Sequence, residues 1–242
     1  MVTCLVDMMR PSIGFSSVKL LEDAGCEVEV PPQSCCGQSN WNSGDRAGAA
    51  DLARTMIAAL RGYQYVVVPS GSCAATVIKD YPQILQGDVM EGEARDLAGR
   101  THEIVSFLTD VMGVGEVDAR FPAKATYHDS CSGLRSLGIQ EQPRKLLASV
   151  EGIELAEMVE SDVCCGFGGT FCVKYPDISN KMVSNKSDHI AETGADLLLA
   201  GDLGCLMNMS GKLSRDGKPV QARHVVEVLA GDTDTPAIGE ER

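Results

Sequence analysis

The sequence predicts an α/β fold built from two tandem, pseudo-symmetric repeats, each a small, mostly parallel sheet flanked by helices. Three observations support this prediction. Eight of the ten cysteines recur in the same order in the two halves of the 242-residue chain. Segments with strand and helix patterning alternate within each half. The composition, with 44% hydrophobic and 23% charged residues, suits a folded core.

The cysteine spacing defines the repeats. Each half has a single cysteine, an adjacent pair and a final cysteine: Cys4, Cys35, Cys36 and Cys73 in the first, and Cys131, Cys164, Cys165 and Cys205 in the second. Gly25 and Gly152 are 127 positions apart, like Cys4 and Cys131. We therefore predict a first repeat at 1–122 and a second at 123–230. Residues 231–242 are acidic with little apolar content, and we expect a mobile tail.

The elements of the first repeat follow from local patterns. We expect an apolar strand at 2–6, a helix that ends before Gly25, and a β-branched strand at 26–30 that leads to the cysteine pair. Residues 45–61 place apolar side chains on one helical face. The continuous apolar run at 65–68 favours a strand covered on both faces.

Two further segments complete the first repeat. About ten residues between Pro82 and Arg100, rich in acidic residues and glycine, have no counterpart in the second half, so we predict a surface excursion. Apolar residues between Ile104 and Met112 follow i, i+3, i+4, i+7 spacing, which predicts a helix.

The second repeat shows the same order of elements. We expect strands at 125–128, 153–159 and 197–200, a helix that ends before Gly152, and a helix over 176–193 with proline in its first turn. In both halves the cysteines follow predicted strands. Ligands bind beyond the carboxyl ends of parallel strands, so four thiols in each half should converge on one point.

Converging thiols indicate a metal centre. Soft thiolates select iron–sulfur clusters, zinc or Cu(I). The chain has no C-x2-C knuckle of the kind typical of structural zinc, and adjacent cysteines suit a multi-iron cluster better than one tetrahedral ion. Glycines after each pair, Gly37 and Gly166, allow N–H groups to approach a bound anion. Structural zinc and simple burial of the cysteines stay as alternatives.

Charge and hydropathy exclude other classes. A net charge of −13 disfavours binding to nucleic acid. No run approaches 18 apolar residues and no secretory signal is visible, so we expect no membrane span and a cytoplasmic location. In an unexported chain, ten cysteines indicate metal or redox chemistry rather than disulfides.

Four motifs resemble a known family: Cys-Cys-Gly-Gln at 35–38, Pro-Ser-Gly-Ser-Cys at 69–73, Cys-Cys-Gly-Phe-Gly-Gly-Thr-Phe at 164–171 and Gly-Cys-Leu-Met-Asn at 204–208. They resemble the CCG (cysteine-rich) domain, which is found twice in one of the subunits of heterodisulfide reductase and in the iron–sulfur subunit of glycolate oxidase. More closely, they are similar to the lactate utilization protein A family.

This resemblance implies an oxidoreductase component that transfers electrons in the oxidation of L-lactate to pyruvate. It implies two [4Fe–4S] clusters, and as partners a ferredoxin-type iron–sulfur protein and a third small subunit. The implied ligands are Cys4, Cys35, Cys36, Cys73, Cys131, Cys164, Cys165 and Cys205. A glycolate oxidase or heterodisulfide reductase-like subunit, or a zinc-binding scaffold, is the alternative.

The sequence departs from the fullest CCG pattern at two positions. Ser70 and Asp202 stand where that pattern has a fifth cysteine, so each side chain is expected to face its cluster. Both a cubane cluster and a noncubane cluster with oxygen ligation by Ser70 or Asp202 are compatible with this change.

Five residues without a clear repeat role are also candidates. Cys26 is expected to be structural, and Cys172 to pack in a loop rather than to bind metal. His128, three residues before Cys131, could bind iron or donate a hydrogen bond to sulfur. Arg10 and Arg135 could bind a 2-hydroxy carboxylate or lie on the surface.

Overall fold

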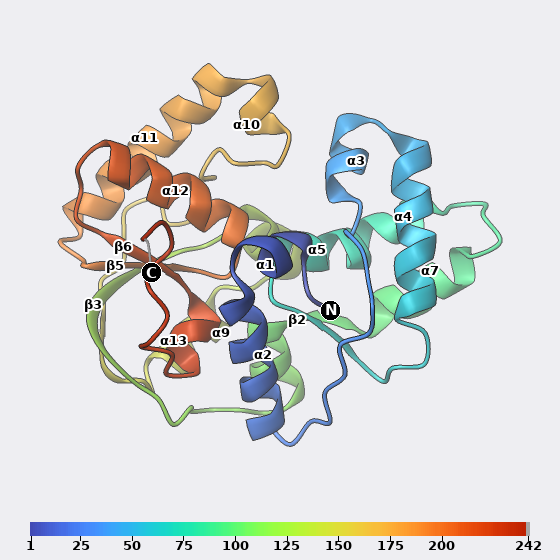
Figure 1. Ribbon diagram of the computed structural model, residues 1–242, viewed down its shortest axis with the longest axis horizontal. Helices are drawn as coiled ribbons and strands as arrows, with labels where there is room; N and C mark the ends of the chain where they lie inside the picture. Colours follow the sequence, from blue (N-terminus) through green and yellow to red (C-terminus); the bar gives the residue numbers. More distant parts are fainter. Residues whose placement is uncertain (241–242) are drawn as a thin grey trace.

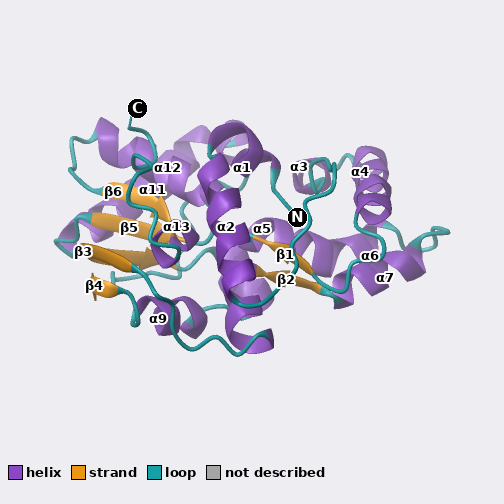
Figure 2. Cartoon of the chain, turned by 60° about the horizontal axis from the view of Figure 1, so that its bottom comes forward, coloured by secondary structure: helices purple, strands orange, loops and turns teal. Residues whose placement is uncertain are grey.

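The computed structural model describes residues 1–240, which form an α/β fold with parallel sheets flanked by helices (Figures 1 and 2). Within these residues, a two-stranded sheet pairs β1 with β2, and a four-stranded sheet has the order β4-β3-β5-β6. Every strand pair is parallel. The predicted fold class is confirmed.

The first part of the chain is mostly helical. Its elements are α1 (Cys4–Met9), α2 (Pro11–Asp23), α3 (Gln38–Ser43), α4 (Arg46–Ala59), β1 (Val66–Val68), α5 (Gly71–Ala75), π-helix η1 (Thr76–Asp80), α6 (Tyr81–Ile84), α7 (Glu91–Gly99), β2 (Thr101–Glu103), α8 (Ile104–Ser106) and π-helix η2 (Phe107–Val111). Helices α2 and α4 and strand β1 confirm three predicted elements. The predicted helix between Ile104 and Met112 is also present, as α8 and η2.

Three predictions for this part are wrong. Residues 2–6 form no strand, because the Thr3 side chain accepts a hydrogen bond from the Val6 amide at 3.3 Å and begins helix α1. Residues 26–30 have no partner strand and run as a loop. The excursion before Arg100 contains α7, whose Ala94 and Leu97 are fully buried, so it belongs to the core and not only to the surface.

The second part contains the larger sheet. Its elements are β3 (Arg120–His128), π-helix η3 (Ser132–Ser136), α9 (Glu141–Leu147), β4 (Glu151–Leu155), α10 (Phe171–Lys174), α11 (Pro176–Glu192), β5 (Leu197–Ala200), α12 (Leu203–Arg215), β6 (Gln221–His224) and α13 (Val225–Leu229). The predicted strand at 197–200 and the helix from Pro176 are confirmed. The strand expected at 153–159 starts earlier and ends at Leu155.

The main hydrophobic core joins the two parts of the chain. Ile13 and Leu20 of α2 pack with Leu199 of β5 and Val225 of α13, and all four side chains are buried. Figure 1 shows α2 at the centre, beside α13. A second core lies among α4, β1 and α7. The N-terminal helices therefore fix the first repeat to the second. The repeat boundary near residue 122 stays a prediction.

The described part of the tail, residues 231–240, packs against the second repeat. Ala237 is 2% exposed. Ser210 of α12 donates a hydrogen bond to the Ile238 carbonyl at 2.8 Å, and the Ile238 amide donates to Ala222 of β6 at 2.9 Å. These contacts hold residues 231–240 against the second repeat, and 241–242 lie outside the described residues. The expected mobility of the tail stays a prediction.

The backbones of the two repeats lie close together at two glycines. A Cβ atom on Gly71, at the start of α5, would lie 3.0 Å from the Gly133 Cα of η3. We expect Gly71→Ala to lower the free energy of unfolding by about 1–3 kcal/mol, because backbone has to move to make room. Gly92→Ala in α7 is the matched control, since nothing lies within 4 Å of its Cβ position. Equal urea midpoints for the two variants would contradict this close approach.

Candidate metal centres

The first candidate centre consists of Cys4, Cys35, Cys36 and Cys73. Cys4 begins α1, the pair lies in the loop before α3, and Cys73 lies in the first turn of α5. The Sγ atoms of Cys4 and Cys35 are 3.8 Å apart. Side-chain hydrogen bonds to Cys35 and Cys73 raise the pKa of Cys36 well above its usual value. The structure thus brings these four cysteines together, and their role as ligands stays a prediction.

The thiols of this centre crowd one another. Hydrogen bonding from Cys36, together with the Gly37 amide and Cys4, lowers the pKa of Cys35 to about 5. Burial, followed by the charge of Cys35, raises the pKa of Cys4 to about 11. One thiolate is therefore favoured among protonated neighbours. A cationic metal centre held by the four cysteines would favour the thiolate form of each one.

The second candidate centre consists of Cys131, Cys164, Cys165 and Cys205. Cys131 precedes η3, the pair lies before α10, and Cys205 lies in the first turn of α12. A hydrogen bond with Cys164 raises the pKa of Cys131 well above its usual value. Cys165 and Cys205 also interact through their side chains, and both are buried. The second set of predicted ligands therefore converges as the first does.

Equivalent glycine amides face one sulfur in each centre. The Gly37 amide donates to Cys35 Sγ at 3.5 Å, and the Gly166 amide donates to Cys164 Sγ at 3.4 Å. Both glycines have a φ of 82°, a conformation that other residues rarely adopt. The expected approach of N–H groups to the thiols is thus present at both cysteine pairs.

Two supporting residues were missed by the sequence analysis. The Tyr81 hydroxyl donates to the Cys36 carbonyl at 3.0 Å, and the Asn208 amide donates to the Cys165 carbonyl at 2.9 Å. Each bond fixes the backbone of a cysteine pair from a neighbouring helix. Asn208 lies in the Gly-Cys-Leu-Met-Asn motif, which was a usable signal. Tyr81 carries no such signal, because η1 and α6 were not foreseen.

Ser70 and Asp202 contact each other across the two repeats, and the expectation that each faces its own cluster stays a prediction. Asp202 Oδ2 accepts hydrogen bonds from the Ser70 hydroxyl at 3.3 Å and from the Ser72 amide at 3.0 Å. Ser70 also accepts from the Cys73 amide at 3.3 Å. Asp202 precedes α12. Burial raises the pKa of Cys205, and the negative charge of Asp202 raises it further. This pair therefore links the N-terminal ends of α5 and α12, the helices that carry the final cysteine of each centre.

The remaining candidates have other contacts. Cys26 packs against the main core, as expected of a structural residue. The Cys172 thiol, in the first turn of α10, donates to the Gly169 carbonyl of the preceding loop at 3.2 Å. Arg10 pairs with Glu227 at 2.8 Å, and Arg135 donates to the Asp162 carbonyl at 3.2 Å. All ten cysteines of the described residues are free thiols.

His128 lies beside the second centre at the end of β3. One of its ring nitrogens and the Sγ atoms of Cys165 and Cys205 all lie within 4.8 Å of one another. Burial, followed by the charge of Lys186, lowers the pKa of His128 to about 3. The imidazole is therefore neutral at physiological pH, which is the form that binds metals.

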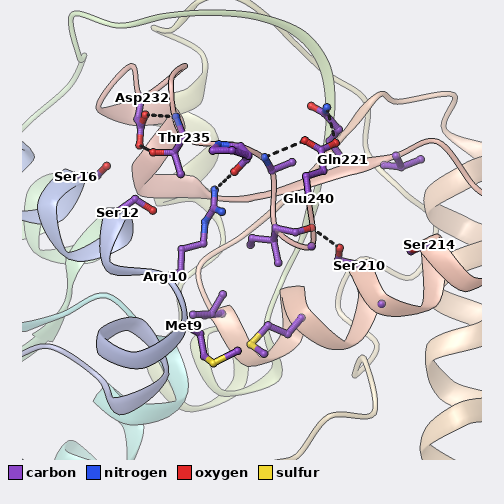
Figure 3. A pocket seen from close by; sticks show the side chains of 18 of the residues that line it. Met9, Arg10, Ser12, Ser16, Ser210, Ser214, Gln221, Asp232, Thr235 and Glu240 are labelled. Atoms are coloured by element: carbon purple, nitrogen blue, oxygen red, sulfur yellow. Dashed lines mark hydrogen bonds between the residues drawn. The ribbon is translucent and has the colours of Figure 1, made fainter. Parts of the chain in front are cut away.

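A groove is lined by residues other than the cysteines of the two centres. It has a volume of about 1310 Å³ and is bounded by α1, α2, α12 and the tail (Figure 3). Its lining residues include Arg10 and Met207. Among the described residues, no cysteine lines this groove. Because the Arg10 guanidinium is engaged by Glu227 and the Pro236 carbonyl, it is not available to a carboxylate ligand.

Over residues 1–240, no helix has both the length and the apolar character that a bilayer span requires.

Comparison with known proteins agrees with the paired cysteine sites. The cysteine-rich domain (CCG) family matches residues 1–78 and 125–210. The chain is 46% identical to Lactate utilization protein A of Oceanobacillus iheyensis, over 94% of each chain. It is 47% identical to the protein of that name from Geobacillus thermodenitrificans, over 94% of this chain and 96% of that one.

A solved structure shares the fold. A hypothetical protein from Helicobacter pylori matches 96% of this chain with 46% of its own, at a TM-score of 0.60 and 14% identity. The family match and the near-complete coverage of the relatives both identify the family of this chain. The chain belongs to the CCG cysteine-rich domain family and, within it, to the lactate utilization protein A family.

Proposed function

We propose that this chain is the iron–sulfur electron-transfer subunit of a system that oxidises L-lactate to pyruvate. The observation that carries the proposal is the convergence of two equivalent sets of four thiols, each with a glycine N–H directed at one sulfur. The relatives are named for lactate utilization, which supports the choice of substrate.

The donor sets fit iron–sulfur clusters. Each set includes an adjacent pair whose second cysteine is buried, Cys36 at 3% and Cys165 at 2% exposure. Crowded soft thiolates with N–H donors nearby suit a cluster that carries negative charge. Cys4, Cys35, Cys36 and Cys73 would hold one cluster, and Cys131, Cys164, Cys165 and Cys205 the other. When bound, [4Fe–4S] clusters accept and release single electrons.

The chain's own contribution is to hold and shield these centres. Oxidation of lactate to pyruvate releases two electrons and two protons, so two one-electron centres match its stoichiometry. Arg10 and Arg135 are engaged by Glu227, the Pro236 carbonyl and the Asp162 carbonyl. We therefore assign electron transfer to this chain and substrate oxidation to the assembled system.

The partners we propose are a ferredoxin-type iron–sulfur protein and a third small subunit, in the cytoplasm. The net charge of −13 favours docking to a partner through complementary positive charge. Docking should therefore weaken as salt concentration rises, since exposed charges are screened.

Anaerobic purification with iron, sulfide and zinc quantified together tests the proposal. We expect iron and acid-labile sulfide in both centres, and reduction of the chain by L-lactate only when the partner proteins are present. Glycolate serves as the competing substrate. Zinc as the sole metal, or reduction by glycolate but not by lactate, would contradict the assignment.

The Ser70–Asp202 link offers a test of cluster ligation. Asp202→Asn keeps a similar shape and removes a negative charge near Cys205. If four thiolates hold the cluster, we expect unchanged iron content and a reduction potential raised on the order of 100 mV, as for one charge at an effective dielectric of about 20. Redox titration followed by electron paramagnetic resonance measures this shift. Iron loss from the second centre alone would instead indicate oxygen ligation by Asp202.

A further inference from the structure

His128 is a buried polar group whose bonding is unexplained by the protein alone. Its side chain is fully buried, and neither ring nitrogen meets hydrogen-bond geometry with a described residue, although the Ser161 carbonyl lies close enough to raise its pKa. Buried polar groups are nearly always paired, because an unpaired one loses its hydration without compensation. A metal-binding imidazole commonly directs its other ring N–H at a backbone carbonyl, so one ring nitrogen of His128 is left for a partner that is not a protein atom.

The sheet places His128 next to the cysteines of the second centre. His128 ends β3, where it pairs in register with Ala200 of β5, and β5 leads into the helix that carries Cys205. The ring nitrogen and the Sγ atoms of Cys165 and Cys205 form one compact group within 4.8 Å. Donor atoms grouped this closely can face one metal centre.

The first centre has no equivalent group. By the repeat spacing, Met1 occupies the position of His128. Met1 packs against the core formed by α4, β1 and α7, and its amino group donates to the Val67 carbonyl at 2.7 Å. Over residues 1–240, a histidine nitrogen thus lies beside the second set of cysteines, and no such group is found beside the first.

We propose that the His128 imidazole is a nitrogen ligand to iron in the second centre, in addition to its cysteines. The inference rests on the proposed function only in that it takes the second centre to hold iron. Neutral imidazole is a common ligand of iron, and it would satisfy one of the two unpaired ring nitrogens. The two centres of the chain then differ in donor set, with thiolates alone in the first and a mixed set in the second.

Nitrogen hyperfine coupling gives a direct test. The parent is the full chain with Cys35→Ser and Cys36→Ser, so that only the second centre gives a signal, labelled with ¹⁵N-histidine and reduced. Pulsed electron paramagnetic resonance should detect strong coupling to one ¹⁵N nucleus. His128→Asn should abolish the coupling, while the control His102→Asn, in β2, should retain it. Absence of strong coupling in an iron-loaded parent, or its persistence in His128→Asn, overturns the proposal.

A second variant guards against misfolding of the first. His128→Cys offers a thiolate in place of the imidazole, and it should retain iron while losing the nitrogen coupling. In metal-free protein, His128→Leu should leave the urea midpoint unchanged or raised, because an unpaired buried group is removed. In loaded protein the same variant should lose iron from the second centre. Stability loss without any change in iron content would show a purely structural histidine and overturn the proposal.

The two proposals fail separately. Normal reduction by lactate without nitrogen coupling rejects only the histidine ligand. Strong coupling without reduction by lactate rejects only the assigned substrate. A parent that binds no iron rejects both.

Discussion

Replacing Cys35 and Cys36 by serine should remove half of the iron and acid-labile sulfide and leave the second centre loaded. The thiols of the first centre interact with one another, and Cys36 touches both Cys35 and Cys73. Serine is a poor ligand for iron compared with a thiolate, so loss of the pair removes two of four donors. The equivalent change at Cys164 and Cys165 should remove the other half.

Iron and sulfide counted per chain, with the spectrum of the remaining centre, measure this outcome. The double variant Cys26→Ser and Cys172→Ser is the matched control, because it also removes two thiols but leaves both sets intact. It should keep its full iron content. Full iron in the Cys35 and Cys36 variant, or loss of all iron, would show that the two centres are not independent four-cysteine sites.

The grouping of the cysteines could be predicted because it depends on a repeated order along the chain. Each final cysteine follows a strand, β1 or β5, and continuous apolar runs identify such buried strands well. The helix from Pro176 was likewise marked by its first-turn proline. Local signals of this kind need no knowledge of how the repeats pack.

The failures have a common physical cause. Residues 26–30 have strand-like composition, but β-propensity counts only when a neighbouring strand supplies the pairing, and none does. At residues 2–6, a short apolar run could not be told from a helix start, and the Thr3 cap decided the outcome. The Ser70–Asp202 link needs both repeats in place, so no pattern within one repeat could reveal it.

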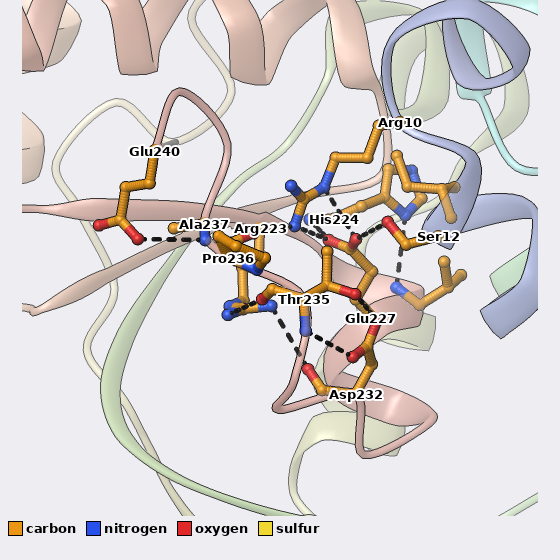
Figure 4. A network of polar contacts seen from close by, with 12 residues as sticks. Arg10, Ser12, Arg223, His224, Glu227, Asp232, Thr235, Pro236, Ala237 and Glu240 are labelled. Atoms are coloured by element: carbon orange, nitrogen blue, oxygen red, sulfur yellow. Dashed lines mark hydrogen bonds and ion pairs between the residues drawn. The ribbon is translucent and has the colours of Figure 1, made fainter. Parts of the chain in front are cut away.

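A buried ion pair between Arg10 and Glu227 joins the N-terminal helices to the second repeat, and removing one partner should be costly. Figure 4 shows Arg10 and Ser12 directed at Glu227. Arg10 donates to both carboxylate oxygens, at 2.8 and 3.2 Å, and Ser12 donates at 2.7 Å. The Glu227 side chain is fully buried, and the His224 amide donates to it at 3.0 Å.

Arg10→Met would leave the Glu227 carboxylate buried without its counter-charge. We expect the free energy of unfolding to fall by about 3–5 kcal/mol, the usual cost of removing one partner of a buried pair. Adding Glu227→Gln should recover part of this loss, because no buried charge is then left unpaired. Urea unfolding of the two single variants and the double variant measures the coupling.

The exposed pair Lys19–Asp23 in α2 provides the control for this cycle, since its side chains are 54% and 61% exposed. Lys19→Met should cost only about 0.3–0.5 kcal/mol. Because α1 runs from Cys4 to Met9, loosening the Arg10 anchor should also release iron more readily from the first centre than from the second. A cost for Arg10→Met no larger than that for Lys19→Met would show that the main core alone fixes α1, and with it Cys4, against the second repeat.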